Sequence, residues 1–136
     1  MKKILSVVLV LVMLVQFSVT AEASQPNPRY INTEQATATL TISDAGNATV
    51  RVTCSGNSNV TRINITVYLE KKVGTTWQRV SIGTSSNMWT YSTTLTRLSK
   101  SFTTQLSTSG EYRTVVKFVV SGTTSETITK YSNSSY

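Results

Sequence analysis

Cys54 is the only cysteine in the 136-residue chain and the first side chain that could do chemistry. A thiol can act as a nucleophile, bind a metal or form half of a disulfide. The chain has no histidine, so the commonest general base and the commonest nitrogen ligand for metals are both missing. One cysteine cannot build a structural zinc site. We therefore expect Cys54 to be either a small buried hydrophobic residue or a thiol joined to another chain or to a small thiol.

Carboxylates are the other candidates for chemistry, because two of them can form a glycosidase-type acid and base pair. The chain has six acidic residues, and those in its strands and turns have structural explanations. Asp44 opens a turn, Glu70 ends an alternating run and Glu111 lies two residues from Arg113. The sequence contains no nucleophile elbow, phosphate-binding loop or calcium-loop pattern. It predicts no catalytic residue, no metal site and no cofactor, so we do not expect an enzyme.

Aromatic and basic side chains offer a better case for binding. Tyr and Trp next to Arg or Lys are typical of surfaces that contact proteins and glycans. Tyr68 points outward by the phase of its run, whereas Trp89 and Tyr91 lie in the polar stretch "SSNMWTYST". As an alternative, both tryptophans could belong to the core, one in each sheet. The predicted binding residues are Trp89, Tyr91, Tyr68, Lys71, Lys72 and Arg79.

The chain carries a net charge of +7 from 13 basic and six acidic residues. The basic residues are dispersed and never form a run longer than two, so we expect no nucleic-acid partner. A dispersed positive charge favours polyanions in general, or it simply keeps a solvated surface soluble.

Alternation of apolar and polar residues predicts the elements that position these side chains. Thr37, Thr39 and Thr41 alternate with apolar residues as a short outward ladder that the following sequence does not repeat, so no role is assigned to it. "DAGN" then turns the chain into a second run, in which Cys54 is in phase with Val50 and Val52 and should be buried. Eight short alternating runs indicate an all-β sandwich or barrel. They cover residues 36–43, 48–54, 63–70, 77–82, 89–95, 100–106, 111–120 and 126–131.

The first 23 residues fit a secretory signal peptide. Lys2 and Lys3 precede an apolar stretch of about a dozen residues, and Ala21 and Ala23 form an A-x-A cleavage site. The apolar stretch is too short to span a bilayer, so no stable membrane insertion is expected. The sequence therefore predicts a secreted protein. Its parts would be a signal peptide (1–23), an extended segment (24–35), one β-sandwich domain (36–132) and a tail (133–136).

Two segments resemble immunoglobulin-like domains. "VRVTCSG" is similar to their second strand, and "SGEYRTVVKFVV" is similar to their sixth. The resemblance implies a single antiparallel sandwich of about seven or eight strands, with Tyr112 as a tyrosine corner and Thr114 at the position of the missing second cysteine. The usual core tryptophan of the third strand is also missing. The layout, including "LEKKVGTTWQRV", is similar to small secreted Gram-positive proteins of undefined function.

Three functions are compatible with these features. The preferred one is a secreted, non-catalytic binding or surface-associated module, whose partner is an extracellular protein or an anionic cell-wall polymer. The second is a secreted toxin or bacteriocin-like protein that acts on membranes. The third is a subunit of a surface polymer, in which residues 24–35 add to the sheet of a neighbour. The oligomeric state is left open.

Overall fold

The computed structural model describes residues 29–136, so the proposed signal peptide (1–23) and the first five residues of the segment that follows it (24–28) lie outside this range. The described chain contains eight β-strands, as the alternation predicts. Their bounds are β1 Thr33–Ile42, β2 Asn47–Gly56, β3 Arg62–Val73, β4 Thr76–Arg79, β5 Trp89–Thr93, β6 Arg97–Gln105, β7 Glu111–Ser121 and β8 Ser125–Ser135. Among these residues no helix is long and apolar enough to cross a membrane.

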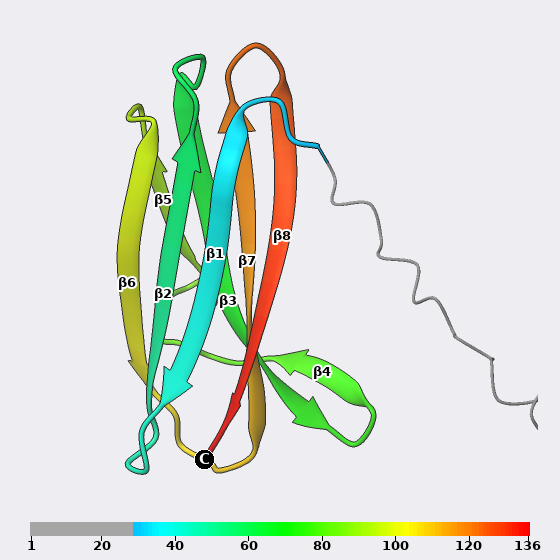
Figure 1. The fold of residues 1–136 in the computed structure, drawn as a ribbon. Helices are drawn as coiled ribbons and strands as arrows, with labels where there is room; N and C mark the ends of the chain where they lie inside the picture. The colour runs from blue at the N-terminus through cyan, green and yellow to red at the C-terminus, as the bar shows by residue number, and fades with distance from the viewer. Residues whose placement is uncertain (1–28) are drawn as a thin grey trace, which may run out of the picture.

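The strands form two antiparallel sheets that pack face to face as an all-β sandwich (Figure 1). Sheet A has three strands in the order β1-β2-β6. Sheet B has the order β4-β3-β7-β8, and β5 pairs with the same edge of β3 as β4 does, nearer the start of β3. In the view of Figure 1, β1, β2 and β6 lie in front of β3, β5 and β7.

The core lies between the sheets and consists of the apolar residues that the alternation places inward. Strand β3 shows the pattern most clearly, because every second side chain from Ile63 to Leu69 is at most 2% exposed. Phe118 and Val116 of β7 and Val50 and Val52 of β2 are also fully buried. The two-residue period of a strand therefore separates this chain into an inner apolar face and two outer polar faces.

Side chains of β8 close the side of the sandwich where β1 and β8 form the sheet edges. The backbone amides of Asn32 and Thr33 donate to the Glu126 carboxylate at 2.8 and 3.1 Å, and the Thr33 hydroxyl adds a bond of 2.9 Å. The amide of Ile31 donates to the same carboxylate. Further down, the amide of Leu40 donates to the Ser132 hydroxyl at 3.0 Å. Polar side chains thus satisfy edge amides of β1 that have no partner strand.

The ordered region extends beyond the boundaries predicted from sequence. Strand β1 begins at Thr33 instead of residue 36, since the Glu126 carboxylate holds the preceding backbone. Strand β8 runs to Ser135, past the predicted strand end at 131 and the predicted domain end at 132, and the Tyr136 carbonyl accepts from the Gly110 amide at 2.9 Å. Residues 33–35 and 133–135 are therefore strand residues of the sandwich. The extended segment predicted at 24–35 and the tail predicted at 133–136 are therefore each shorter than predicted.

Cys54 is buried, 3% exposed, as its phase with Val50 and Val52 predicts. Burial raises the pKa of its thiol to about 11, so the reactive thiolate is scarce at neutral pH. The Tyr112 hydroxyl donates to the Thr108 carbonyl at 2.5 Å, which is the geometry of a tyrosine corner.

Thr114 does not lie opposite Cys54. It pairs with Ser132, whose hydroxyl contacts Leu40, and Leu40 pairs with Val50. This register aligns Thr114 with Val50, which is four residues or about 13 Å along β2 from the thiol. The buried Thr114 hydroxyl instead donates to the Tyr68 carbonyl at 3.3 Å. Thr114 therefore matches the second cysteine of immunoglobulin-like domains by its place in the sequence, but it does not lie opposite Cys54 in the sandwich.

Candidate functional site

Five aromatic and arginine side chains gather on the outer face of sheet B. We call them the aromatic–arginine cluster: Tyr68 of β3, Trp77 and Arg79 of β4, Arg113 of β7 and Tyr131 of β8. Tyr68, Arg113 and Tyr131 face outward because they alternate with the buried core positions of their strands. Trp77 and Arg79 lie on the same face because they pair with the outward positions Lys72 and Glu70 of β3. The register sets their rows, since Tyr68 pairs with Val115 and Val115 with Tyr131, while Glu70 pairs with both Arg79 and Arg113.

Arg79 stacks on Tyr68, with the guanidinium carbon 3.5 Å from the ring centroid. This is a close cation–π contact between neighbouring strands of the β3–β4 hairpin. Arg79 takes part in neither of the two ion pairs among residues 29–136, so its N–H groups are free of a carboxylate partner there. The outer edge of its guanidinium is available to carboxylates or carbonyl oxygens of a partner.

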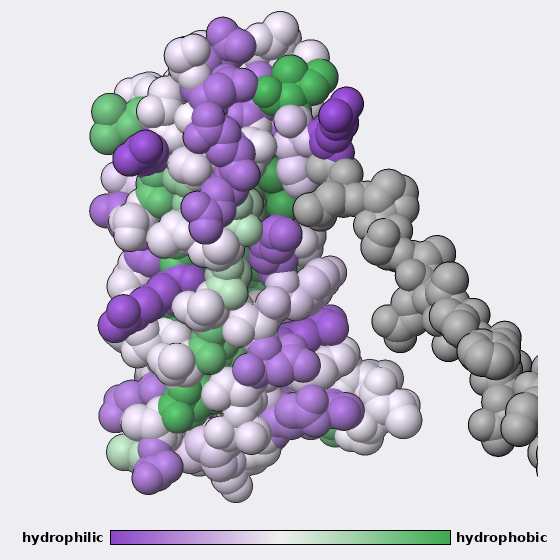
Figure 2. Space-filling model, viewed as in Figure 1, coloured by the Kyte–Doolittle hydropathy of each residue, from purple (hydrophilic) through white to green (hydrophobic). Residues whose placement is uncertain are grey.

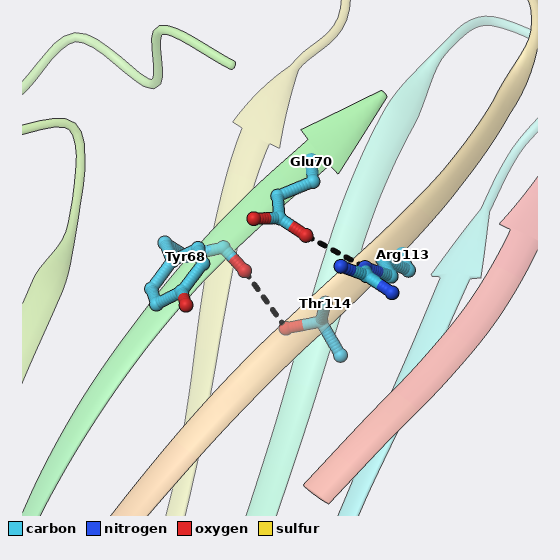
Figure 3. Close-up of polar contacts among 4 residues, drawn as sticks. All are labelled: Tyr68, Glu70, Arg113 and Thr114. Atoms are coloured by element: carbon cyan, nitrogen blue, oxygen red, sulfur yellow. Dashed lines mark hydrogen bonds and ion pairs between the residues drawn. The ribbon is translucent and has the colours of Figure 1, made fainter. Parts of the chain in front are cut away.

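Arg113 is held from three sides. Its Nε donates to the Glu70 carboxylate at 2.6 Å, a contact between β7 and β3 that Figure 3 shows. Its guanidinium carbon is 4.4 Å from the Trp77 ring centroid and 5.1 Å from the Tyr131 ring centroid. Both charged side chains are largely buried, so the pair is fixed more firmly than an exposed one. Arg113 therefore joins β4 to β8 across the sheet.

Val115 shows how closely the cluster packs. By register its side chain points outward between Tyr68 and Tyr131, yet it is 3% exposed. Neighbouring side chains must therefore cover it and form a small second core on the outside of sheet B. Tyr131 itself is 58% exposed and remains available for contact.

Lys72 extends the cluster toward the tip of the β3–β4 hairpin. Its ammonium lies 3.0 Å from the Glu111 carboxylate and 5.9 Å from the Trp77 ring centroid. Both charged groups are well exposed, so this pair contributes little stability. Beyond it, Val73 near the hairpin tip is 47% exposed.

The structure brings together three of the six predicted binding residues: Tyr68, Lys72 and Arg79. Lys71 points away from this face, donates to the Thr108 hydroxyl at 2.8 Å and lies over the Tyr112 ring.

The other two predicted residues, Trp89 and Tyr91, lie at the open side of the sandwich between β5 and β6. Trp89 packs against the core and stacks on Phe102 at a centroid distance of 5.4 Å. Tyr91 is 37% exposed, with the Lys100 ammonium 4.1 Å from its ring centroid.

Sequence reasoning missed Trp77, Arg113 and Tyr131 as binding candidates. Trp77 is out of phase with Val80 and Ile82, and the reason is that β4 ends at Arg79, so those later residues are not on the same strand. Arg113 and Tyr131 alternate outward in their runs, which is a usable signal. Only the strand order and register place them beside β3 and β4, however.

The cluster offers contact chemistry. It presents guanidinium edges, exposed ring surface and two carboxylates that already have basic partners. Among residues 29–136 no group of three or more His, Cys, Asp or Glu side chains could hold a metal ion.

In comparisons with protein-family models, curated proteins and solved structures, nothing matches this chain.

Proposed function

We propose that this protein is a secreted, non-catalytic binding module that contacts an extracellular protein through the aromatic–arginine cluster. The observation that carries the proposal is the group of mutually contacting side chains Tyr68, Trp77, Arg79, Arg113 and Tyr131 on one outer sheet face. Secretion rests on the amino-terminal sequence, with its Lys-Lys start, apolar stretch and A-x-A site.

A protein partner fits this cluster better than a sugar polymer does. Trp, Tyr and Arg are the residue types enriched among those that dominate protein–protein binding. Arg79 lies on the Tyr68 ring and Arg113 on the Trp77 ring, so a face of each ring is already in contact with a guanidinium. A sugar would have to displace these contacts to stack on those faces. The guanidinium edges, by contrast, suit the carboxylates and carbonyls of a protein.

We also propose that the sandwich is immunoglobulin-like, and the strand order supports this. In such domains the first, second and fifth strands adjoin in one sheet, and the third, sixth and seventh adjoin in the other. The orders β1-β2-β6 and β3-β7-β8 have the same connectivity, with β4 and β5 as additional strands beside β3. Sandwiches of this kind commonly serve as rigid supports for binding surfaces.

The experiment is capture of surface proteins from the producing cells by the immobilised protein, followed by measurement of affinity for the captured protein. The double variant Arg79→Ala/Tyr131→Ala removes one unpaired guanidinium and the most exposed ring of the cluster. We expect it to lower affinity at least about tenfold, because such residues commonly contribute 1–2 kcal/mol or more each.

The matched control is Tyr91→Ala/Lys100→Ala, which likewise removes one tyrosine and one basic side chain, here in cation–π contact between β5 of sheet B and the facing β6 and outside the cluster. This control should bind like the natural protein. Equal affinity of all three proteins for the captured partner, or loss only in the control, would show that the cluster is not the contact surface.

A further inference from the structure

The outer face of sheet A is covered by hydroxyl side chains in a regular pattern across all three strands. Register places Thr37 beside Thr53 and Ser99, and Thr41 beside Thr49 and Thr103. Between these rows, Thr39, Arg51 and Ser101 form a third row. In Figure 2, viewed with sheet A toward the reader, most of the surface is purple or near white, the colours of hydrophilic and nearly neutral residues.

Two shallow depressions on this face adjoin, because Thr53 and Ser99 line both of them, and we call the two together the Ser/Thr groove. Arg51, Lys100 and Ser101 complete one end. Arg97, Ser55 and Gln35 lie at the other end, and the nearly buried Cys54 and Leu98 form part of the lining. No carboxylate lines either depression.

The two arginines of the groove are free of ion pairs. Neither Arg51 nor Arg97 belongs to the two ion pairs formed among residues 29–136, and both are exposed. Arg97 lies opposite Ser55, four residues along β2 from Arg51, so their Cα atoms are about 14 Å apart. The groove thus has a guanidinium toward each end, hydroxyl groups between them and no opposing charge.

The residues that line the Ser/Thr groove indicate which class of ligand it would bind. Arg forks and Ser or Thr hydroxyls are groups that contact phosphate oxygens. The groove has no aromatic side chain on which a base or a sugar ring could stack, and no large exposed apolar side chain to anchor a protein. We propose that the Ser/Thr groove binds an extended polyol-phosphate polymer, a chain without rings whose phosphates pair with Arg51 and Arg97 and whose hydroxyls bond to the Ser and Thr side chains.

The test measures binding of the full protein to soluble poly(glycerol phosphate) by titration calorimetry at several salt concentrations. We expect log affinity to fall linearly with log salt, as it does when phosphates are neutralised. The variant Arg51→Thr/Arg97→Thr keeps strand-forming side chains in place. It should bind at least about tenfold more weakly, and its salt slope should be smaller by about 0.7 for each lost phosphate contact.

The matched control, Lys117→Gln/Lys130→Gln, removes the same amount of charge from β7 and β8 of sheet B. It should keep most of the affinity. An equal loss in the control and the arginine variant would mean that net charge alone drives binding, and unchanged affinity in the arginine variant would place the polymer elsewhere. Either result overturns the proposal.

Two further polymers test the occupant class. Polygalacturonate carries carboxylates on sugar rings, and an oligo(dT) strand carries phosphates with bases. Binding of either as tight as that of poly(glycerol phosphate) would overturn the assignment of a ring-free phosphate polymer. Thermal unfolding is measured for each variant as a folding control. A midpoint near that of the natural protein shows that affinities are compared between folded proteins.

Discussion

At the scale of single residues, Glu126 connects the start of the sandwich to its last strand. Partial burial alone would raise the pKa of this carboxyl, but the bonds from the Asn32 amide, the Thr33 hydroxyl and the amides of Ile31 and Thr33 outweigh it. The net result is a pKa below the ordinary value of 4.5. A carboxylate whose pKa is lowered by folding stabilises the native state above its unfolded-state pKa. It loses that contribution as the pH falls through the native value.

We therefore predict that Glu126→Gln lowers the free energy of unfolding by about 2 kcal/mol at pH 7, the usual scale for hydrogen bonds to a charged group. The difference from the natural protein should shrink as the pH falls from 5 to 3, because the natural side chain then becomes neutral too. Urea unfolding followed by circular dichroism at each pH measures it. Glu111→Gln, which removes only an exposed ion pair, should change stability by less than about 0.5 kcal/mol. A pH-independent difference for Glu126→Gln would contradict the prediction.

At the scale of elements, two tight turns show what the strands require of glycine. Gly46 and Gly74 both have positive φ, 78° and 62°. A Cβ at Gly46 would lie 2.9 Å from the Leu106 carbonyl oxygen, whereas a Cβ at Gly74 would have nothing within 4 Å. The first turn is thus enclosed by the body of the sandwich, and the second, at the tip of the β3–β4 hairpin, is open.

We predict that Gly74→Ala costs about 1 kcal/mol, the penalty of a left-handed conformation for a residue with a Cβ. Gly46→Ala should cost about 2–3 kcal/mol more, since the backbone at Leu106 must also move. Chemical unfolding of both variants gives the comparison. Similar losses in the two variants would show that the turn at Gly46 can relax without cost.

Much of the element structure could be predicted from the sequence, because alternation is a local signal. The β1–β2 hairpin and the inward side of β3 from Ile63 to Leu69 follow directly from it. The start of β1 at Thr33 could not be predicted, since it depends on a carboxylate 93 residues away.

Each of the two candidate surfaces likewise has a part that the local sequence pattern predicts and a part that only the strand order and register reveal. Tyr68 and Arg79 share one hairpin, so their common face could be anticipated from local pattern. Arg113 and Tyr131 join them only through strand order. The ladder of Thr37, Thr39 and Thr41 is unrepeated along the neighbouring sequence, but its repeats lie across the sheet on β2 and β6, at positions that only the register reveals.

At the scale of the whole molecule, the two proposed surfaces lie on opposite outer faces of one sandwich. Sheets that pack face to face are about 10 Å apart, so bulky ligands on the two outer faces need not meet. The core between them is one continuous cluster of buried side chains.

We therefore predict independent occupancy. A saturating concentration of poly(glycerol phosphate) should change affinity for the captured protein by less than about twofold, since the two ligands contact different sheets. The Arg51→Thr/Arg97→Thr variant should still capture protein, and Arg79→Ala/Tyr131→Ala should still bind the polymer. Competition measured by surface plasmon resonance decides the point, and displacement of one ligand by the other would show that the surfaces overlap.

The seam between β1 and β8 has a consequence for how this chain behaves at high concentration. An unpaired strand edge is a template on which another molecule can add a strand, the first step toward fibrils. Here Glu126 and Ser132 occupy amide groups at both ends of the β1 edge. An incoming strand must break those bonds before it can form its own, so the same contacts that join the sheets also act against self-association along β1.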